Sequence, residues 1–254
     1  MKMNRASTIQ KGFTLVELAV VLVIVGILLS SFIGTLATRI EATQKSETIE
    51  ELREIKQAMF AYAYVNGYLP CPDCAVANGN CAAAQVGDGI ADHNGAVCRE
   101  DEETGNVPWV TLGLGRGDAW GTRYRYAVQN EFSDETSPFT VDTAVGTAEI
   151  REPDFVADAT GAVEHTLADN VVAIIFSHGK NGYGGIGENG VAKNAIPAAN
   201  TDEAKNADDD AIFYMRTETG VDAAIAGGEF DDLVIWISEY ELKAKMVQAG
   251  KLPL

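Results

Sequence analysis

The chain has 254 residues, of which 46% are hydrophobic, and this length and composition predict one or two globular domains with a sizeable core. Its 37 acidic residues outnumber the 19 basic ones, which gives a formal charge of −18 at pH 7. This charge argues against nucleic acid as a partner, because phosphate backbones bind positively charged surfaces. Three histidines and four cysteines leave few ligands for a large metal cluster.

The first forty residues combine a basic leader with a long apolar run. Residues 1–12 carry three basic side chains and no acid, and residues 18–38 carry no charge. About 20 apolar residues in a helix can cross a bilayer core, so we expect a transmembrane helix over residues 13–38. The positive-inside rule then places the leader, residues 1–12, in the cytoplasm and the rest of the chain outside the inner membrane.

Glu17 stands at the start of this run, where a carboxylate is unfavourable without a partner. The stretch from Lys11 to Glu17, Lys-Gly-Phe-Thr-Leu-Val-Glu, resembles the class III signal of type IV pilins and type II secretion pseudopilins. The resemblance implies that a prepilin peptidase cuts after Gly12 and methylates the new terminus at Phe13. It also implies that Glu17 pairs with the terminal amine of a neighbouring subunit during filament assembly.

The helical pattern continues beyond the apolar run to Asn66, and Gly67 and Pro70 then supply a stop signal. Apolar residues at spacings of three and four form one stripe, which predicts that residues 39–68 are an amphipathic helix packed on a head of residues 69–254. The members of this stripe are Ile49, Leu52, Ile55, Met59 and Ala63.

The head is predicted to contain an antiparallel sheet, because its strand signals do not alternate regularly with helices. A terminal helix is expected at 238–249, and the glycine-rich, acidic segment 178–210 is expected to be a long loop. Together with the long N-terminal helix, this pattern predicts an α+β, pilin-like fold. The predicted strands are 122–128, 171–177, 211–216 and 233–237, with weaker signals at 139–142 and 148–151.

The four cysteines of the head, Cys71, Cys74, Cys81 and Cys98, favour two structural disulfides, because thiols are oxidised outside the inner membrane. Their spacing does not choose among the three pairings. Two alternatives stay open: a zinc site with four thiolates, and a redox-active C-x-x-C formed by Cys71 and Cys74.

The loop from Gly87 to Gly95 carries short oxygen-bearing side chains among glycines, a composition that can wrap calcium. Its candidate ligands are Asp88, Asp92 and Asn94, although the loop lacks the full EF-hand pattern. No other cofactor is expected. The acidic groups at 208–210 and 229–232 are further clusters that calcium could use, and the favoured interpretation of both is a solvated turn.

No catalytic constellation is predicted. Ser177 and His178 are adjacent in a predicted strand and would point to opposite faces, so they would not form a nucleophile and base pair. The aromatic residues are predicted to lie in the core or on the sheet, with a carbohydrate-binding face as the alternative. These aromatic residues are Trp109, Trp120, Tyr124, Tyr126 and Trp236.

The sequence therefore favours a minor pilin or pseudopilin of a type IV pilus or type II secretion filament, and not an enzyme. Expected partners are other pilin or pseudopilin subunits, the prepilin peptidase and an inner-membrane assembly platform. Two other interpretations stay open: an adhesive or substrate-binding module displayed on a filament, and a membrane-anchored periplasmic redox protein or enzyme. The same N-terminal pattern serves motility, secretion, DNA uptake and attachment, so it does not identify the machine.

Overall fold

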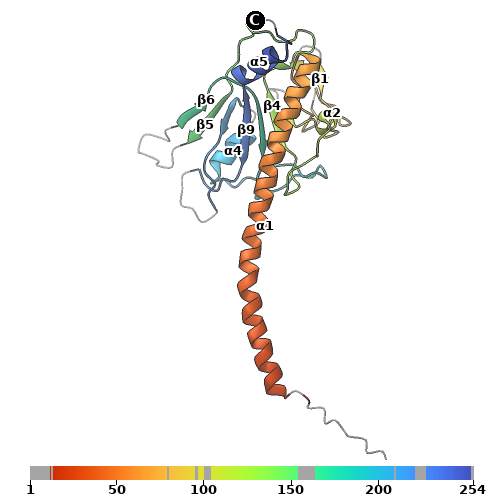
Figure 1. Ribbon diagram of the computed structural model, residues 1–254. Helices are drawn as coiled ribbons and strands as arrows, with labels where there is room; N and C mark the ends of the chain where they lie inside the picture. Colours follow the sequence, from red (N-terminus) through yellow and green to blue (C-terminus); the bar gives the residue numbers. More distant parts are fainter. Residues whose placement is uncertain are drawn as a thin grey trace, which may run out of the picture. The chain divides into compact units, whose positions relative to one another are not determined.

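The computed structural model describes residues 12, 14–78, 80–94, 97–99, 104–153, 164–208, 210–220 and 227–252 (Figure 1). The chain divides into two units, residues 1–44 and residues 45–254. The helix α1, Leu15–Asn66, contributes residues to both units, and each unit is described by itself.

In the first unit, the described part of α1 carries an exposed apolar surface. The large apolar side chains described between Leu15 and Leu28 are all exposed, from 42% at Val25 to 87% at Leu15. Among the described residues, no helix is both long enough and apolar enough to cross a membrane. The transmembrane helix expected over residues 13–38 therefore stays a prediction.

In the second unit, α1 buries the stripe that the sequence predicts. Ile49 is the exception, because it is only partly buried while the neighbouring Thr48 is fully buried. Gly67 ends the helix with a φ of +86°, and its N–H donates to the Ala63 carbonyl at 2.8 Å. The buried apolar residues of this part of α1 are Leu52, Ile55, Met59, Phe60 and Ala63, all at most 3% exposed.

A four-stranded antiparallel sheet forms the centre of the second unit, in the order β3-β4-β7-β9. Strand β7 is buried at all seven positions because both faces of the sheet are covered. One face packs on α1 and on the C-terminal helix α5, Glu239–Gln248 (Figure 1). The strands are β3 Thr104–Asn106, β4 Arg125–Val128, β7 Val171–Ser177 and β9 Leu233–Ser238.

The other face of this sheet packs on a three-stranded sheet in the order β6-β5-β8, through a cluster that includes Ile150, Phe176 and Phe213. Strands β5 and β6 are antiparallel, but β5 and β8 are parallel. The all-antiparallel prediction is wrong for this pair, because a crossover through β6, β7 and α4 separates its two strands in the chain. The bounds are β5 Glu149–Pro153, β6 Glu164–Ala168 and β8 Ile212–Tyr214.

Several local predictions need correction. The expected loop 178–210 contains a helix, α4 Thr201–Ala207. The weak strand signal at 139–142 is wrong, because Thr140 N–H donates to Thr143 Oγ1 at 2.8 Å and closes a turn instead. The short elements that were not predicted include β3 and four others: β1 His93–Asn94, β2 Val97–Cys98, α2 Trp109–Leu112 and α3 Asn130–Ser133.

The α+β arrangement itself is confirmed: a long N-terminal helix, an antiparallel central sheet and a short C-terminal helix. Helix α5 begins where the sequence predicts, because Ser238 Oγ accepts the Glu241 N–H at 3.2 Å and caps it. An ion pair of 2.7 Å between Lys56 Nζ and Glu241 Oε2 joins α5 to the buried part of α1.

Candidate functional site

The N-terminal segment begins α1 with a reciprocal pair of hydrogen bonds. Thr14 donates to Glu17 Oε2 from its backbone N–H at 2.9 Å and from its hydroxyl at 2.8 Å. Glu17 N–H donates back to Thr14 Oγ1 at 3.2 Å. This is a capping box, in which a threonine before the helix and a glutamate three residues later satisfy each other's free backbone donors.

The predicted processing residues lie next to this cap. Gly12 is exposed and outside any helix, and a side chain added there would meet no atom within 4 Å. Phe13 lies outside the described residues. Gly12 therefore precedes the first helical residue, Leu15.

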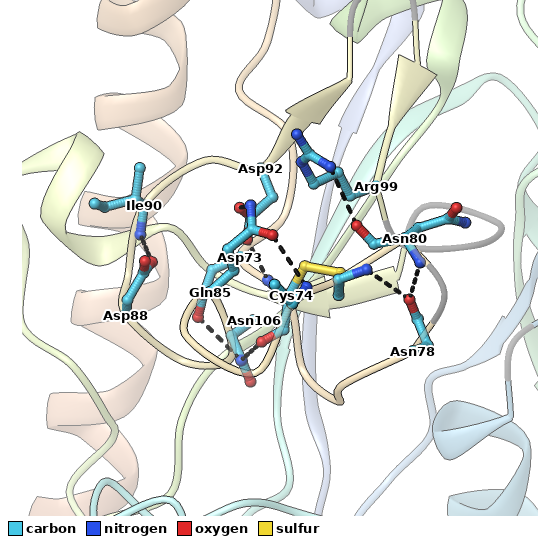
Figure 2. Close-up of a disulfide and its surroundings, with 12 residues drawn as sticks. Asp73, Cys74, Asn78, Asn80, Gln85, Asp88, Ile90, Asp92, Arg99 and Asn106 are labelled. Atoms are coloured by element: carbon cyan, nitrogen blue, oxygen red, sulfur yellow. Dashed lines mark hydrogen bonds between the residues drawn. A yellow bond between two sulfur atoms is a disulfide. The ribbon is translucent and has the colours of Figure 1, made fainter.

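The second candidate site is the cysteine loop, in which two disulfides are present (Figure 2). Cys71 is bonded to Cys98 and Cys74 to Cys81, with Cα atoms 5.4 Å and 6.1 Å apart. The two cysteines of the C-x-x-C sequence thus belong to different bonds. Since all four sulfurs are in disulfides, neither the dithiol redox motif nor the four-thiolate zinc site is present, and the prediction of two structural disulfides is confirmed.

The acidic residues predicted beside this loop converge with a third acid that the sequence analysis missed. One carboxylate oxygen from each of Asp73, Asp88 and Asp92 lies within 4.8 Å of the others. Asn94 is the second residue of β1, where it pairs with Val97 of β2. Asp73 lies within the Cys-Pro-Asp-Cys stretch and is buried beside Asn106 of β3. No pattern in the sequence indicates this burial, so the sequence analysis missed Asp73.

Four oxygens of this first acidic group accept hydrogen bonds, two from backbone N–H groups and two from side-chain amides. Asp92 accepts the Cys74 N–H at 2.9 Å and the Gln85 side-chain amide at 2.7 Å, as Figure 2 shows. Asp88 Oδ1 accepts the Ile90 N–H at 2.8 Å. Burial raises the pKa of Asp73 to about 7, and one of its oxygens has no hydrogen-bond partner. The calcium site expected at Asp88, Asp92 and Asn94 stays a prediction.

Ser177 and His178 do not act on each other. The Ser177 hydroxyl donates to Asp118 Oδ2 at 2.6 Å and accepts the Gly179 N–H at 3.0 Å. His178 is fully buried, with its ring edge-on to Phe176, and burial lowers its pKa to about 3. The serine proton is therefore directed at a carboxylate that also organises a turn, which is a structural arrangement.

The aromatic residues do not form an exposed binding face. Trp109, Tyr124 and Tyr126 are at most 5% exposed, and Trp120 and Trp236 are partly buried. Arg116 and Arg123 lie over the Trp109 ring, each 5.2 Å from its centroid. These contacts place the aromatic side chains in the packing of the head, as predicted, and give no support to a carbohydrate-binding face.

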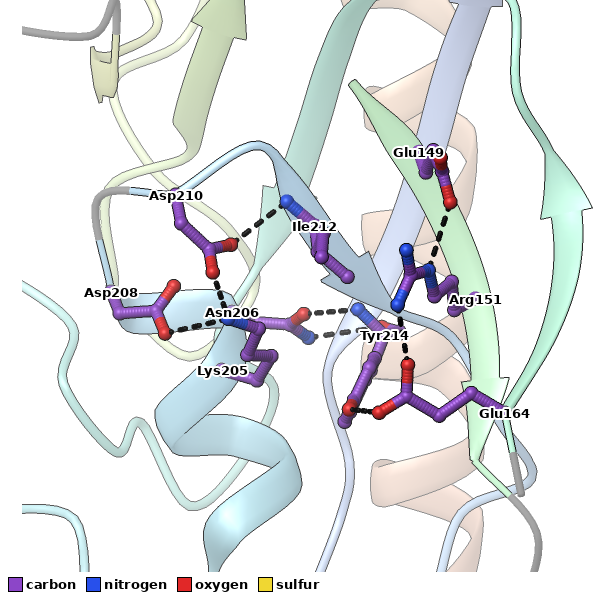
Figure 3. A network of polar contacts seen from close by, with 9 residues as sticks. All are labelled: Glu149, Arg151, Glu164, Lys205, Asn206, Asp208, Asp210, Ile212 and Tyr214. Carbon is purple, nitrogen blue, oxygen red and sulfur yellow. Dashed lines mark hydrogen bonds and ion pairs between the residues drawn. The ribbon is translucent and has the colours of Figure 1, made fainter. Parts of the chain in front are cut away.

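A polar network joins α4 to the three-stranded sheet, as Figure 3 shows. Arg151 on β5 forms two ion pairs. Its Nε lies 2.8 Å from Glu149 Oε2, and its Nη1 lies 2.6 Å from Oε2 of Glu164 on β6. Asn206 on α4 exchanges two hydrogen bonds with the backbone of Tyr214, at 3.0 Å and 2.6 Å. This network fixes α4, and with it the neighbouring acidic residues, against β8.

A cavity of about 350 Å³ opens beside β4, β7 and β8. Its lining mixes the apolar Ile174 and Phe213 with polar groups such as Gln129 and Asp210. Gln129 is engaged in the fold, since its side-chain amide donates to the Val171 carbonyl at 2.6 Å.

One comparison with known proteins bears on the N-terminal segment. A model of the prokaryotic N-terminal methylation motif matches residues 8–33. Neither the curated proteins nor the solved structures compared with the chain give a match. The matched segment contains Gly12, Phe13 and Glu17, the residues predicted for processing and assembly.

Proposed function

Since its methylation motif makes this a protein of the type IV pilin or pseudopilin type, we propose that it is a minor subunit of a type IV pilus or type II secretion filament. A prepilin peptidase cuts after Gly12 and methylates Phe13. Before assembly, the subunit lies in the inner membrane with its head in the periplasm. An inner-membrane assembly platform then adds it to the filament, where it contacts other pilin or pseudopilin subunits. The protein has no catalytic task of its own.

The observation that carries this proposal is the N-terminal segment, in which the motif, the helix start and the apolar surface follow one another. The cleavage point precedes the cap formed by Thr14 and Glu17, so removal of the leader leaves the start of α1 complete. The exposed apolar side chains between Leu15 and Leu28 need a covering, because soluble proteins rarely leave such a surface in water. Lipid covers these side chains while the subunit is in the membrane, and neighbouring α1 helices cover them in the filament.

The minor role is supported by the head. It carries two disulfides, two packed sheets and a strongly acidic composition, which suit a specialised position better than a repeated fibre subunit. The redox alternative loses its main support because the C-x-x-C cysteines are bonded to different partners. The adhesive alternative depends on exposed aromatic side chains, and the candidate aromatic residues are buried or partly buried.

The experiment is a processing assay in cells that express an active prepilin peptidase. We expect the wild-type chain to lose its leader and Gly12→Val to retain it. Because a side chain at Gly12 meets no atom within 4 Å, loss of cleavage in this variant does not arise from misfolding. Gly115→Val, at another glycine with open space and no positive φ, is the matched control and should be cleaved normally. A wild-type chain that keeps residues 1–12 in the presence of the peptidase overturns the proposal.

A further inference from the structure

The disulfide between Cys71 and Cys98 lies beside a histidine. His93 is the first residue of β1 and stands directly opposite Cys98 of β2 in their antiparallel pair. Side chains of directly opposite residues lie on the same face of such a pair, so the imidazole is brought close to the sulfur atoms. His93 Nδ1 lies 3.3 Å from Cys71 Sγ, and the ring packs edge-on against Tyr68, with the ring centroids 5.5 Å apart.

The second ring nitrogen of His93 indicates where the imidazole carries its proton. Cys71 N–H donates to His93 Nε2, with 3.4 Å between the two nitrogen atoms, so Nε2 is the acceptor. Burial lowers the pKa of His93, although the carboxylates of Glu135 and Asp92 act in the opposite direction. The neutral ring then carries its proton on Nδ1, an assignment that follows from the hydrogen-bond pattern. Nδ1–H is therefore the group that donates to Cys71 Sγ.

The other sulfur of this bond has a weaker donor and better access. Cys98 Sγ lies 3.3 Å from Ser133 Oγ. The same hydroxyl lies 3.3 Å from the Gln129 carbonyl oxygen and 3.5 Å from that of Asn130, and carbonyl oxygens accept hydrogen bonds more strongly than sulfur. Cys98 is 7% exposed, whereas Cys71 is fully buried. The two sulfurs thus differ, because Cys71 has the N–H donor and Cys98 is the more accessible.

The Cys74–Cys81 bond has different surroundings. Cys74 N–H donates to Asp92 Oδ2 at 2.9 Å, and Asp73 directly precedes Cys74 in the chain, as Figure 2 shows. In the part of the chain that the structure describes, no side chain donates a hydrogen bond to either sulfur of this bond. Nearby carboxylates disfavour a thiolate, whereas a hydrogen-bond donor stabilises one. Cys71 therefore has surroundings that favour a thiolate, and Cys74 has surroundings that oppose one.

We propose that the Cys71–Cys98 bond is a thiol–disulfide exchange site, at which an incoming dithiol attacks Cys98 and Cys71 leaves as a thiolate stabilised by His93. Exchange is faster when the attacked sulfur is accessible and when the leaving thiolate is stabilised, and the two sulfurs divide these properties between them. The proposal concerns how a structural bond forms and breaks, so it does not depend on filament assembly.

The electrons and protons of the exchange balance with the dithiol as the reductant. A thiolate of the dithiol forms an S–S bond to Cys98 Sγ, the Cys71–Cys98 bond breaks, and the electron pair passes to Cys71 Sγ. The second thiol of the dithiol loses its proton, attacks the dithiol sulfur of the mixed disulfide and releases Cys98 as a thiolate. The two cysteine thiolates take up the protons that the dithiol released. The same steps in reverse form the bond from a disulfide partner, and Cys71 then closes it.

The first test locates the mixed disulfide in the wild-type chain, so it needs no variant that could unfold. The oxidised full chain in detergent micelles is treated with glutathione, a monothiol that has no second thiol of its own to release Cys98. The reaction is quenched with acid and mapped by peptide mass. We expect glutathione on Cys98 and a free thiol at Cys71. An adduct on Cys71, or only on the Cys74–Cys81 pair, overturns the proposal, as does no adduct under conditions in which the unfolded chain reacts.

The second test measures the rate of reduction by dithiothreitol, with the Cys74–Cys81 bond of the same chain as the internal control. His93→Phe keeps a ring beside Tyr68 and removes the donor, so it should slow loss of the Cys71–Cys98 bond at least about threefold. The rate at the control bond should stay unchanged. His93→Asn, whose side-chain amide also offers an N–H donor, should be slowed less.

The direction of the change separates this role from a purely structural one. A substitution at His93 that merely loosened the head would expose the disulfides and speed their reduction. Unchanged or faster loss of the Cys71–Cys98 bond in His93→Phe therefore contradicts the proposal. Equal slowing in His93→Phe and His93→Asn would also contradict it, because the N–H donor would then have no part in the rate.

Discussion

Thr14 and Glu17 satisfy each other across the first turn of α1, with the Glu17 carboxylate accepting both donors of Thr14. The carboxylate that is proposed to pair with a neighbour's terminal amine therefore already has a partner within its own chain. In a filament the same group has to serve two roles, as a helix cap and as a counter-ion. The two roles are separable by substitution, because a cap needs a hydrogen-bond acceptor and an ion pair needs a charge.

Glu17→Gln removes the charge and keeps the cap, since glutamine also serves at the third position of a capping box. We expect this variant to be cleaved normally and to form no filaments. Thr14→Ala keeps the charge and weakens the helix start by about 1 kcal/mol, and it should still assemble. The measurements are N-terminal sequencing and the yield of sheared filaments. The reverse result, assembly with Gln and none with Ala, would mean that the cap and not the charge governs assembly.

The two disulfides should contribute unequally to stability. The Cys71–Cys98 bond joins residues 27 apart in sequence and includes core side chains, whereas the Cys74–Cys81 bond joins residues 7 apart. Loop-closure entropy predicts losses in the free energy of unfolding of about 3.5 and 2.4 kcal/mol when each pair is replaced by serine. Urea unfolding of the two double variants checks the order. A larger loss for the shorter loop would contradict this account.

Asp118 should be more important for stability than its position in a turn suggests. It accepts the Trp120 and Thr122 N–H groups at 3.0 and 2.9 Å and the Ser177 hydroxyl at 2.6 Å. Asp118→Ala leaves these buried donors without an acceptor, which should cost about 2–4 kcal/mol, whereas Ser177→Ala should cost about 1 kcal/mol. Denaturant midpoints at constant slope measure both losses. Equal losses in the two variants would show that the serine bond alone stabilises the turn.

His178 should make the head sensitive to acid. Burial lowers its folded-state pKa to about 3 from an ordinary value of 6.5, so the unfolded chain binds the proton more readily. Its contribution to stability is complete above pH 6.5 and is lost as the pH falls from 6.5 toward 3, by up to about 4 kcal/mol. His178→Leu, of similar volume, should lose less stability than wild type over that range. The free energy of unfolding at several pH values measures the difference, and parallel curves for the two proteins would contradict the prediction.

The features that the sequence predicts well are those that depend on a single local pattern. Strand β7 is found at Val171–Ser177 as predicted, because a short apolar run rich in β-branched residues favours a strand that is covered on both faces. The stripe on α1 is found because helical spacing aligns it on one face. The N-terminal motif is recognised because Gly12, Phe13, Glu17 and the apolar run stand at fixed spacings in the sequence.

The features that the sequence analysis missed depend on distant partners. Strand β6, Glu164–Ala168, is mostly exposed and polar, so only its pairing with β5 makes it a strand. Helix α4 is short, and it is held by hydrogen bonds to Tyr214 and the segment before β9. The disulfide pairing and the burial of Asp73 and Asp232 likewise arise from contacts between separate segments. No spacing in the sequence specifies such contacts.

The proposed subunit is processed after Gly12 and carries two disulfides in its functional form. Its most direct test is the intact mass of the protein extracted from its native membrane, measured before and after thiol reduction. We expect a chain that starts at N-methylated Phe13 and gains four hydrogens on reduction, two for each disulfide. A chain that retains the leader, or that gains no mass on reduction, would contradict it.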